Sequence, residues 1–226
     1  MAFKSTTPDT KQKKWPDLQL HFFNYIPKTE PMRMLYVDEQ TRSEFEPRDA
    51  WEDGWSCFPT VLRPESRGSL TLASTDPFDH PHIRANYLDS QYDIDMLLKG
   101  IEECYALVRT NTMQSIGATL LETSPLTACK QHKFESPEYW VCYFKLRPFT
   151  VYHPVGTCKM GPGTDSTTVV DPQLRVHGLT GLRVADASVM PWITSANTQI
   201  PTVMIAEKAA DMILGKQTPR PIQLDN

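Results

Sequence analysis

One histidine differs from the other five in this 226-residue chain because of the residues that follow it. His153 lies in the segment YHPVGTCKMGPG, which holds three of the ten glycines, Gly156, Gly161 and Gly163. The unperturbed pKa of histidine, about 6.5, suits this side chain to proton transfer near neutral pH, and glycine lets the backbone approach a ligand closely. The segment therefore favours His153 as a general base, against the alternative of a turn histidine hydrogen-bonded to the backbone.

A second group of polar residues precedes the last predicted helix. The segment PWITSANTQIPT, residues 191–202, contains Thr194, Ser195, Asn197 and Thr198. The first N–H groups of a helix have no partners within it and carry partial positive charge, so they suit an electron-rich ligand group. The alternative is ordinary capping of the helix by the side chain of Asn197 or Thr198.

Other residues with metal or nucleophile chemistry form no recognisable motif. His80 and His82 lie beside Asp79; the two histidines could bind a metal, but the segment is more typical of a surface turn. The sequence has no G-x-G-x-x-G, P-loop, G-x-S-x-G or H-E-x-x-H, and we predict no metal site. The five cysteines are odd in number and include no C-x-x-C pair, so we expect buried or free thiols instead of a disulfide scaffold.

The elements that would carry these residues follow from periodicity and capping signals. Polar and apolar residues alternate over 17–22, which predicts a half-buried strand with His21 on its solvated face, and residues 57–62 predict a second strand. Helices are predicted after an S-x-x-D cap at Ser90 and after Ser136, where proline occupies the first turn.

Toward the C-terminus, short strands and one helix are predicted around the candidate residues. TVYH, residues 150–153, predicts a strand that ends at His153, and GLRVAD, residues 181–186, predicts another. A helix is predicted over roughly 198–214, with apolar residues at helical spacing and Pro201 in its first turn.

Composition and charge exclude several classes of protein. Acidic residues outnumber basic ones by 27 to 23, so nucleic-acid binding has no electrostatic support. No run of about 18 apolar residues exists, which predicts no membrane span. The start of the chain, residues 1–14, lacks the apolar core of a signal peptide, and we expect a flexible leader there; the sequence assigns no cellular compartment.

Three blocks in the second half of the chain occur in a characteristic order: HPVGTCKMG, then VVDPQLRVHGLTGLRVADASVMP, then NTQIPTVMIAEKAADMIL. They resemble the C-terminal signature of the glucose–methanol–choline (GMC) oxidoreductases, and they are most similar to insect FAD-dependent glucose dehydrogenase-like members. An earlier segment, LRPESRGSLTLASTDPFDHPHIRANYL, resembles the strands of the family's substrate domain. The resemblance extends over roughly residues 15–215.

The resemblance implies a FAD-dependent oxidation of a small-molecule alcohol or sugar to a carbonyl compound, by a dehydrogenase or an oxidase. It implies that His153 takes the hydroxyl proton, that Asn197 hydrogen-bonds the same substrate oxygen, and that the hydride passes to flavin N5. Four further positions match residues that line the flavin, namely Asp186, Ala187 and the backbone of Thr198 and Gln199.

The resemblance also implies an α+β fold, in which a mainly antiparallel sheet carries helices on one face and forms the substrate domain. We expect the leader at 1–14, the substrate-binding domain at 15–178, a returning flavin-side segment at 179–216 and a tail at 217–226. The returning strand, loop and helix would belong to a Rossmann-like FAD-binding domain, which is missing from this chain.

The missing glycine-rich turn leaves three hypotheses open. The chain is the C-terminal part of a FAD-linked enzyme and is inactive by itself, or it is a short non-catalytic relative that acts as a binding module, or it is a lyase that uses the same scaffold without net redox chemistry. Under the first hypothesis Leu182, Val184 and the apolar stripe of the last helix should expose apolar surface.

Overall fold

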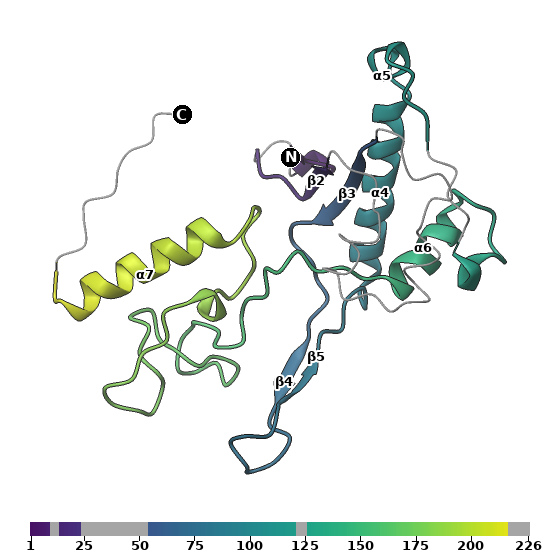
Figure 1. Ribbon diagram of the computed structural model, residues 1–226. Helices are drawn as coiled ribbons and strands as arrows, with labels where there is room; N and C mark the ends of the chain where they lie inside the picture. The colour runs from purple at the N-terminus through teal and green to yellow at the C-terminus, as the bar shows by residue number, and fades with distance from the viewer. Residues whose placement is uncertain (10–13, 24–53, 121–125, 217–226) are drawn as a thin grey trace. The chain divides into compact units, whose positions relative to one another are not determined.

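The computed structural model describes most of the chain. The described residues are 1–9, 14–23, 54–120 and 126–216. The tail expected at 217–226 lies outside them. The described residues form small antiparallel sheets and several helices (Figure 1), in agreement with the predicted α+β class.

The chain divides into two compact units. The first comprises Met1–Gly68 and Arg84–Phe149. The second comprises Ser69–Ile83 and Thr150–Asn226, so a short excursion from the middle of the chain joins the C-terminal segment. The second compact unit begins at residue 150, whereas the sequence predicted a domain boundary at 179. The predicted boundary between a substrate-binding domain and a flavin-side segment stays a prediction.

The first unit is built on a three-stranded antiparallel sheet. Its strands lie in the order β1 (Ala2–Lys4), β2 (Leu18–Phe23) and β3 (Ser56–Val61). β1 forms within the leader that was expected to be flexible. Pro59 of β3 lies opposite Leu20, on a strand that forms the edge of this described sheet, where a proline without an N–H is tolerated.

Strand β2 is buried on both of its faces. Its apolar residues Leu18 and Leu20 pack in a core beside Met96. On the other face His21 is only 8% exposed, and its Nε2 lies 2.8 Å from Oε1 of Gln19. The prediction of a solvated His21 is therefore wrong, because this central strand is covered on both sides and a neighbouring amide satisfies the imidazole.

Helix α4 (Gln91–Val108) packs against β2 and β3. Ser90 caps it as predicted, because its hydroxyl accepts a backbone N–H of the first turn. Asp93 does not complete the predicted cap. Its buried carboxylate instead accepts the backbone N–H groups of Glu65 and Ser66 at 2.8 and 3.0 Å, and so fixes the turn that leads out of the sheet.

Among the described residues of the first unit, three shorter helices follow α4 in the chain. They are α5 (Asn111–Ser115), the 3₁₀ turn η1 (Thr127–Cys129) and α6 (Pro137–Leu146). The predicted start of α6 is confirmed: the Ser136 hydroxyl accepts the Tyr139 N–H, and Pro137 occupies the first turn.

Two disulfides cross-link the first unit, contrary to the expectation of unpaired thiols. Cys57 of β3 is bonded to Cys104 of α4, and Cys129 of η1 is bonded to Cys142 of α6. Cys158, in the second unit, is a free cysteine. The bonded cysteines are 47 and 13 residues apart in sequence, so they meet only when their elements pack. The sequence has no short cysteine spacing that would predict these pairs.

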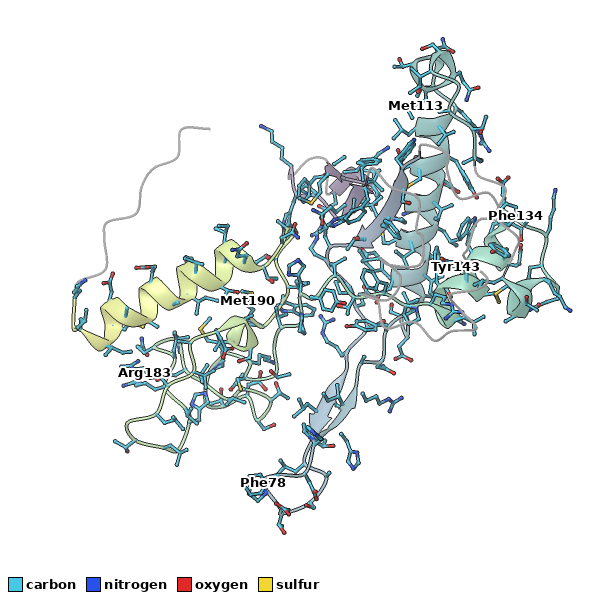
Figure 2. All side chains as sticks on the ribbon, in the orientation of Figure 1. Phe78, Met113, Phe134, Tyr143, Arg183 and Met190 are labelled. Carbon is cyan, nitrogen blue, oxygen red and sulfur yellow. A yellow bond between two sulfur atoms is a disulfide. The ribbon has the colours of Figure 1, made fainter. Side chains whose placement is uncertain are left out.

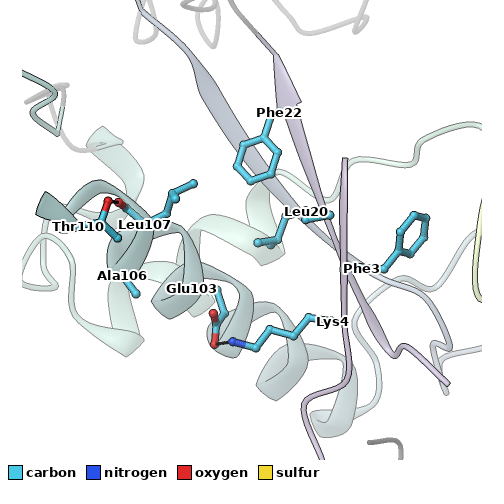
Figure 3. Close-up of a pocket in the computed structure, with 9 residues that line it drawn as sticks. Phe3, Lys4, Leu20, Phe22, Glu103, Ala106, Leu107 and Thr110 are labelled. Atoms are coloured by element: carbon cyan, nitrogen blue, oxygen red, sulfur yellow. Dashed lines mark hydrogen bonds and ion pairs between the residues drawn. The ribbon is translucent and has the colours of Figure 1, made fainter. Parts of the chain in front are cut away.

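A cavity of about 410 Å³ lies in the first unit between the start of the chain and α4 (Figure 3). Phe3, Leu20 and Leu107 contribute apolar lining, and Lys4 of β1 forms an ion pair with Glu103 of α4 beside it. None of the predicted site residues lines this cavity.

The excursion at residues 69–83 is an exposed hairpin. β4 (Ser69–Thr71) and β5 (His82–Arg84) form a two-stranded sheet. Phe78, in the loop that joins them, is almost fully exposed (Figure 2). His80 and His82 lie on exposed positions there.

The C-terminal part of the second unit packs around one helix. α7 (Gln199–Ile213) contacts the 3₁₀ turn η2 (Ala187–Val189). The core between them and the preceding loops consists of Val170, Leu174, Val189 and Ala209. The helix predicted over 198–214 is confirmed.

The two strands predicted near the candidate residues do not form. Residues 150–153 adopt no strand, and Tyr152 has a φ of +62°. Residues 181–186 contribute only an isolated bridge between Arg183 and Arg175. Both segments are short, and within the described chain neither meets a neighbouring strand along its length.

The apolar surface expected near the C-terminus is present in part. Leu182, Met204 and Ile213 are half or more exposed. Val184 and the middle of the α7 stripe, at Ala209, instead pack into the core of the unit. Helix α7 therefore buries one face and leaves apolar side chains on another. Among the described residues, no helix is both long and apolar enough to span a bilayer.

Candidate active site

The imidazole of His153 is hydrogen-bonded at both of its nitrogens to residues at the start of α7. Nδ1 lies 2.7 Å from Oγ1 of Thr198, and Nε2 lies 2.9 Å from Nδ2 of Asn197. His153 and Asn197 are partly buried, and Thr198 is buried. Three of the predicted site residues, 44 and 45 positions apart in sequence, are thus in direct contact.

The loop after His153 is fixed to η2 by backbone hydrogen bonds. The N–H of Cys158 donates to the carbonyl of Ser188 at 3.0 Å, and the N–H of Met160 donates to the carbonyl of Val189 at 2.9 Å. Gly156 has a φ of +87°, and a Cβ there would lie 3.3 Å from the Met190 carbonyl oxygen. Glycine is therefore favoured in this conformation, and Met190 itself is buried.

Helix α7 positions the two partners of His153. Asn197 precedes the helix and Thr198 is its N-cap residue. The helix is held by Ala209, which is buried in the core of the unit, and by Ile205, which packs against that core. Thr202, one turn along, donates its N–H and its hydroxyl to the Thr198 carbonyl, at 3.0 and 2.7 Å, which fixes the backbone at the site.

The orientation of the Asn197 amide, with its nitrogen toward the ring, favours one tautomer of the imidazole. The Asn197 amide nitrogen carries only donors, so it donates to Nε2 of His153, and Nε2 must present its lone pair. In a neutral ring the proton is then on Nδ1, which donates to the Thr198 hydroxyl oxygen. Nε2 therefore acts as an acceptor beside an amide donor, an arrangement that can take a proton from a hydroxyl group and bind its oxygen.

The other predicted residues lie close by but use their side chains differently. Asp186 caps η2, because its carboxylate accepts the Ser188 N–H at 2.7 Å. Ala187 is the first residue of that turn, and Gln199 is the exposed first residue of α7. The turn that contains Asp186 is also the one to which the loop after His153 is bonded.

The start of α7 fits an electron-rich group of a cofactor. No side chain caps the helix and no acidic residue lies in its first turn, so its first N–H groups keep their partial positive charge. The Ser195 hydroxyl, in the loop just before, is buried and has no hydrogen-bond partner within the described part of the chain. Such a group is normally satisfied, and a bound polar ligand is one way to satisfy it.

In the described part of the chain, no three His, Cys, Asp or Glu side chains gather as a potential metal site. The cysteine nearest the histidine in sequence, Cys158, is partly buried.

One functional feature of the site was not found in the sequence. Thr198 was matched to the flavin through its backbone, whereas in the structure its hydroxyl contacts His153. A threonine before a helix ordinarily predicts a cap, so no sequence signal indicated that the hydroxyl faces a residue 45 positions away.

Comparisons with known proteins identify the family of the chain. A GMC oxidoreductase family model for the C-terminal region matches residues 64–206, more than half of the chain. The chain is 40% identical over 198 residues to glucose dehydrogenase (FAD, quinone) of Drosophila pseudoobscura pseudoobscura. The aligned region covers 88% of this chain and 30% of that protein. It is also 40% identical over 215 residues to alcohol dehydrogenase (acceptor) of Pseudomonas putida, covering 95% of this chain and 34% of that protein.

The fold of the chain is similar to that of solved oxidoreductase structures. A crystal structure of formate oxidase is similar with a TM-score of 0.66 and 26% sequence identity, over 93% of this chain and 36% of that chain. The chain thus spans about a third of the length of the curated relatives that it matches. The family model and the relatives together show that the chain belongs to the GMC oxidoreductase family.

Proposed function

We propose that this chain forms the substrate-side part of a FAD-dependent oxidoreductase that converts an alcohol or a sugar to a carbonyl compound. The observation that carries the proposal is the paired contact at Nε2 of His153, where an acceptor nitrogen lies 2.9 Å from the amide nitrogen of Asn197. The names of the relatives, a FAD- and quinone-linked glucose dehydrogenase and an alcohol dehydrogenase, support the same class of substrate.

The two side chains act on one substrate oxygen. Nε2 of His153 accepts the hydroxyl proton, and the Asn197 amide donates to the oxygen as negative charge develops on it. Loss of that proton makes the carbinol carbon a better hydride donor. FAD, when bound, would supply the hydride acceptor, so that the alcohol would lose one proton and one hydride and become a carbonyl compound.

The residues near the start of α7 would hold the flavin on one side. Asp186, Ala187 and the backbone of Thr198 and Gln199 would line it, and the uncapped helix N-terminus would face its electron-rich pyrimidine edge. The chain has no G-x-G-x-x-G turn to hold the FAD diphosphate. A Rossmann-like unit outside these 226 residues would supply it and would cover the exposed apolar face of α7.

The test is anaerobic flavin reduction in the flavin-loaded protein that contains this chain. His153→Ala should slow reduction by a panel of primary alcohols and aldoses at least about a hundredfold, the usual scale for a general base. His132→Ala, a histidine of the first unit outside the site, is the matched control and should reduce its flavin at the wild-type rate.

The same measurement separates the competing functions. Bleaching of the flavin by an alcohol requires net oxidation, which neither a binding module nor a lyase performs. Reduction of His153→Ala at a rate near that of the wild type would remove this residue from the proposed role.

A further inference from the structure

Thr198 does not use its hydroxyl as the other helix N-cap residues do. Ser90, Thr110 and Ser136 each have an extended backbone and accept an N–H of their own helix. Thr198 has helical backbone angles, φ −84° and ψ −5°, and caps nothing. A side-chain cap typically contributes about 1 kcal/mol, so α7 forgoes this stabilisation.

The Thr198 hydroxyl is hydrogen-bonded to His153 instead. Its oxygen lies 2.7 Å from Nδ1, and Thr198 is only 6% exposed, so little water competes for this bond. A hydroxyl can either accept or donate. Because the Asn197 amide donates to the opposite nitrogen, the Thr198 oxygen is on the accepting side of the Nδ1–H bond.

We propose that Thr198 is a positioning residue, which holds the proton of the neutral imidazole on Nδ1 and so keeps Nε2 unprotonated, with its lone pair ready for a substrate hydroxyl that displaces the Asn197 amide from it. This inference rests on the proposed function of His153 as the base. The tautomer of a histidine is set by the hydrogen bond that its other nitrogen makes, and Thr198 provides that bond here.

The two bonds also fix the ring orientation. Asn197 and Thr198 are consecutive in the chain and contact opposite nitrogens of one ring, so they hold it at both ends. Loss of the Thr198 acceptor would leave the Nδ1–H group unpaired next to a buried side chain. This favours turning the ring, or moving the proton to Nε2 while the Asn197 amide turns so that its oxygen accepts that proton. Either change removes the acceptor from the position where the substrate proton must arrive.

The direct test measures the tautomer without any cofactor. In the 226-residue chain labelled with ¹⁵N-histidine, the ¹⁵N shifts of His153 at alkaline pH report which ring nitrogen carries the proton, and His153→Gln assigns the signal. The wild type and Thr198→Ser should both show the Nδ1–H form. Thr198→Val, which has nearly the same shape but no hydroxyl, should show mainly the Nε2–H form.

The matched control is Thr202→Val, because Thr202 is on the same helix and its hydroxyl contacts only a backbone carbonyl that keeps a second donor. It should retain the wild-type tautomer. A wild-type His153 in the Nε2–H form, or a Thr198→Val spectrum identical to that of the wild type, would overturn the proposal.

A second readout uses the flavin-loaded protein. Thr198→Val should slow flavin reduction about tenfold to a hundredfold, and Thr198→Ser should restore most of the rate. Failure of the His153→Ala experiment would overturn the proposed function, whereas a normal rate in Thr198→Val alone would overturn only the role of Thr198.

Discussion

Both ring nitrogens of His153 are hydrogen-bonded by consecutive residues, so the chemistry of the site depends on which nitrogen donates and which accepts. In the proposed function Asn197 would have the second role, because it would offer a neutral N–H to an oxygen that becomes more negative as the proton leaves. A preorganised donor of this kind acts on the transition state more than on the bound alcohol.

Replacement of Asn197 by leucine should therefore lower the rate constant for flavin reduction about a hundredfold, the usual effect of removing one such donor, with a smaller change in the apparent affinity for the alcohol. Stopped-flow reduction over a range of alcohol concentrations separates the two quantities. Gln173→Leu, which changes an exposed side chain of the same unit, is the control. A loss of affinity with an unchanged rate constant for flavin reduction would show that the amide only binds substrate.

The pairing of His153 with Asn197 was foreseeable, because both residues lie in motifs that resemble one family's signature and their chemistry is complementary. The contact through the Thr198 hydroxyl was not foreseeable. It depends on a backbone rotation at a single N-cap residue, which propensity does not encode.

Among the elements, α4 shows how closely a helix and a sheet can approach in the first unit. Gly100 faces β3, and a Cβ at this position would overlap the Pro59 ring and lie 3.2 Å from Cδ1 of Leu18. Glycine in a helix interior normally costs about 1 kcal/mol relative to alanine. Here the close approach to Pro59 of β3 and Leu18 of β2 is the compensating factor.

Gly100→Ala should accordingly lower the free energy of unfolding, by about 1–3 kcal/mol, in spite of the better helix propensity of alanine. Urea unfolding followed by circular dichroism measures this change. Glu102→Ala, at an exposed position of the same helix, should stay within about 0.5 kcal/mol of the wild type. A Gly100→Ala variant that is more stable than the wild type would contradict the predicted close packing.

Helices and strands differed in how far the sequence predicted them. The starts of α4 and α6 and the extent of α7 follow from caps and apolar spacing, which are local signals. The segments 150–153 and 181–186 have residues typical of strands, but a strand also needs a partner along its length. That requirement is non-local, and the described chain does not meet it there.

For the molecule as a whole, the stabilisation by disulfides is confined to the first unit. Both lie in the first unit, whereas the second unit, with the site, contains only the free Cys158. Neither pairing was predictable, because five cysteines without short spacings allow many combinations.

Removal of the Cys57–Cys104 bond in a Cys57→Ala/Cys104→Ala variant should lower the free energy of unfolding by about 4 kcal/mol, and removal of the Cys129–Cys142 bond by about 3 kcal/mol, because the first closes the longer loop. Urea unfolding of each variant measures the loss. Cys158→Ala should change the free energy by less than about 1 kcal/mol. Equal stability of the wild type and the Cys57→Ala/Cys104→Ala variant would contradict the predicted contribution.

These cross-links also determine how the protein should be prepared. Disulfides persist in the secretory pathway and the bacterial periplasm and are rare in a cytosol kept reduced by glutathione and thioredoxin. Periplasmic or secreted expression should therefore give a better-folded first unit than bacterial cytosolic expression. Thiol reductants in the purification buffer would reduce the two disulfides of the first unit. A Cys158→Ser background would prevent the remaining thiol from exchanging with either disulfide.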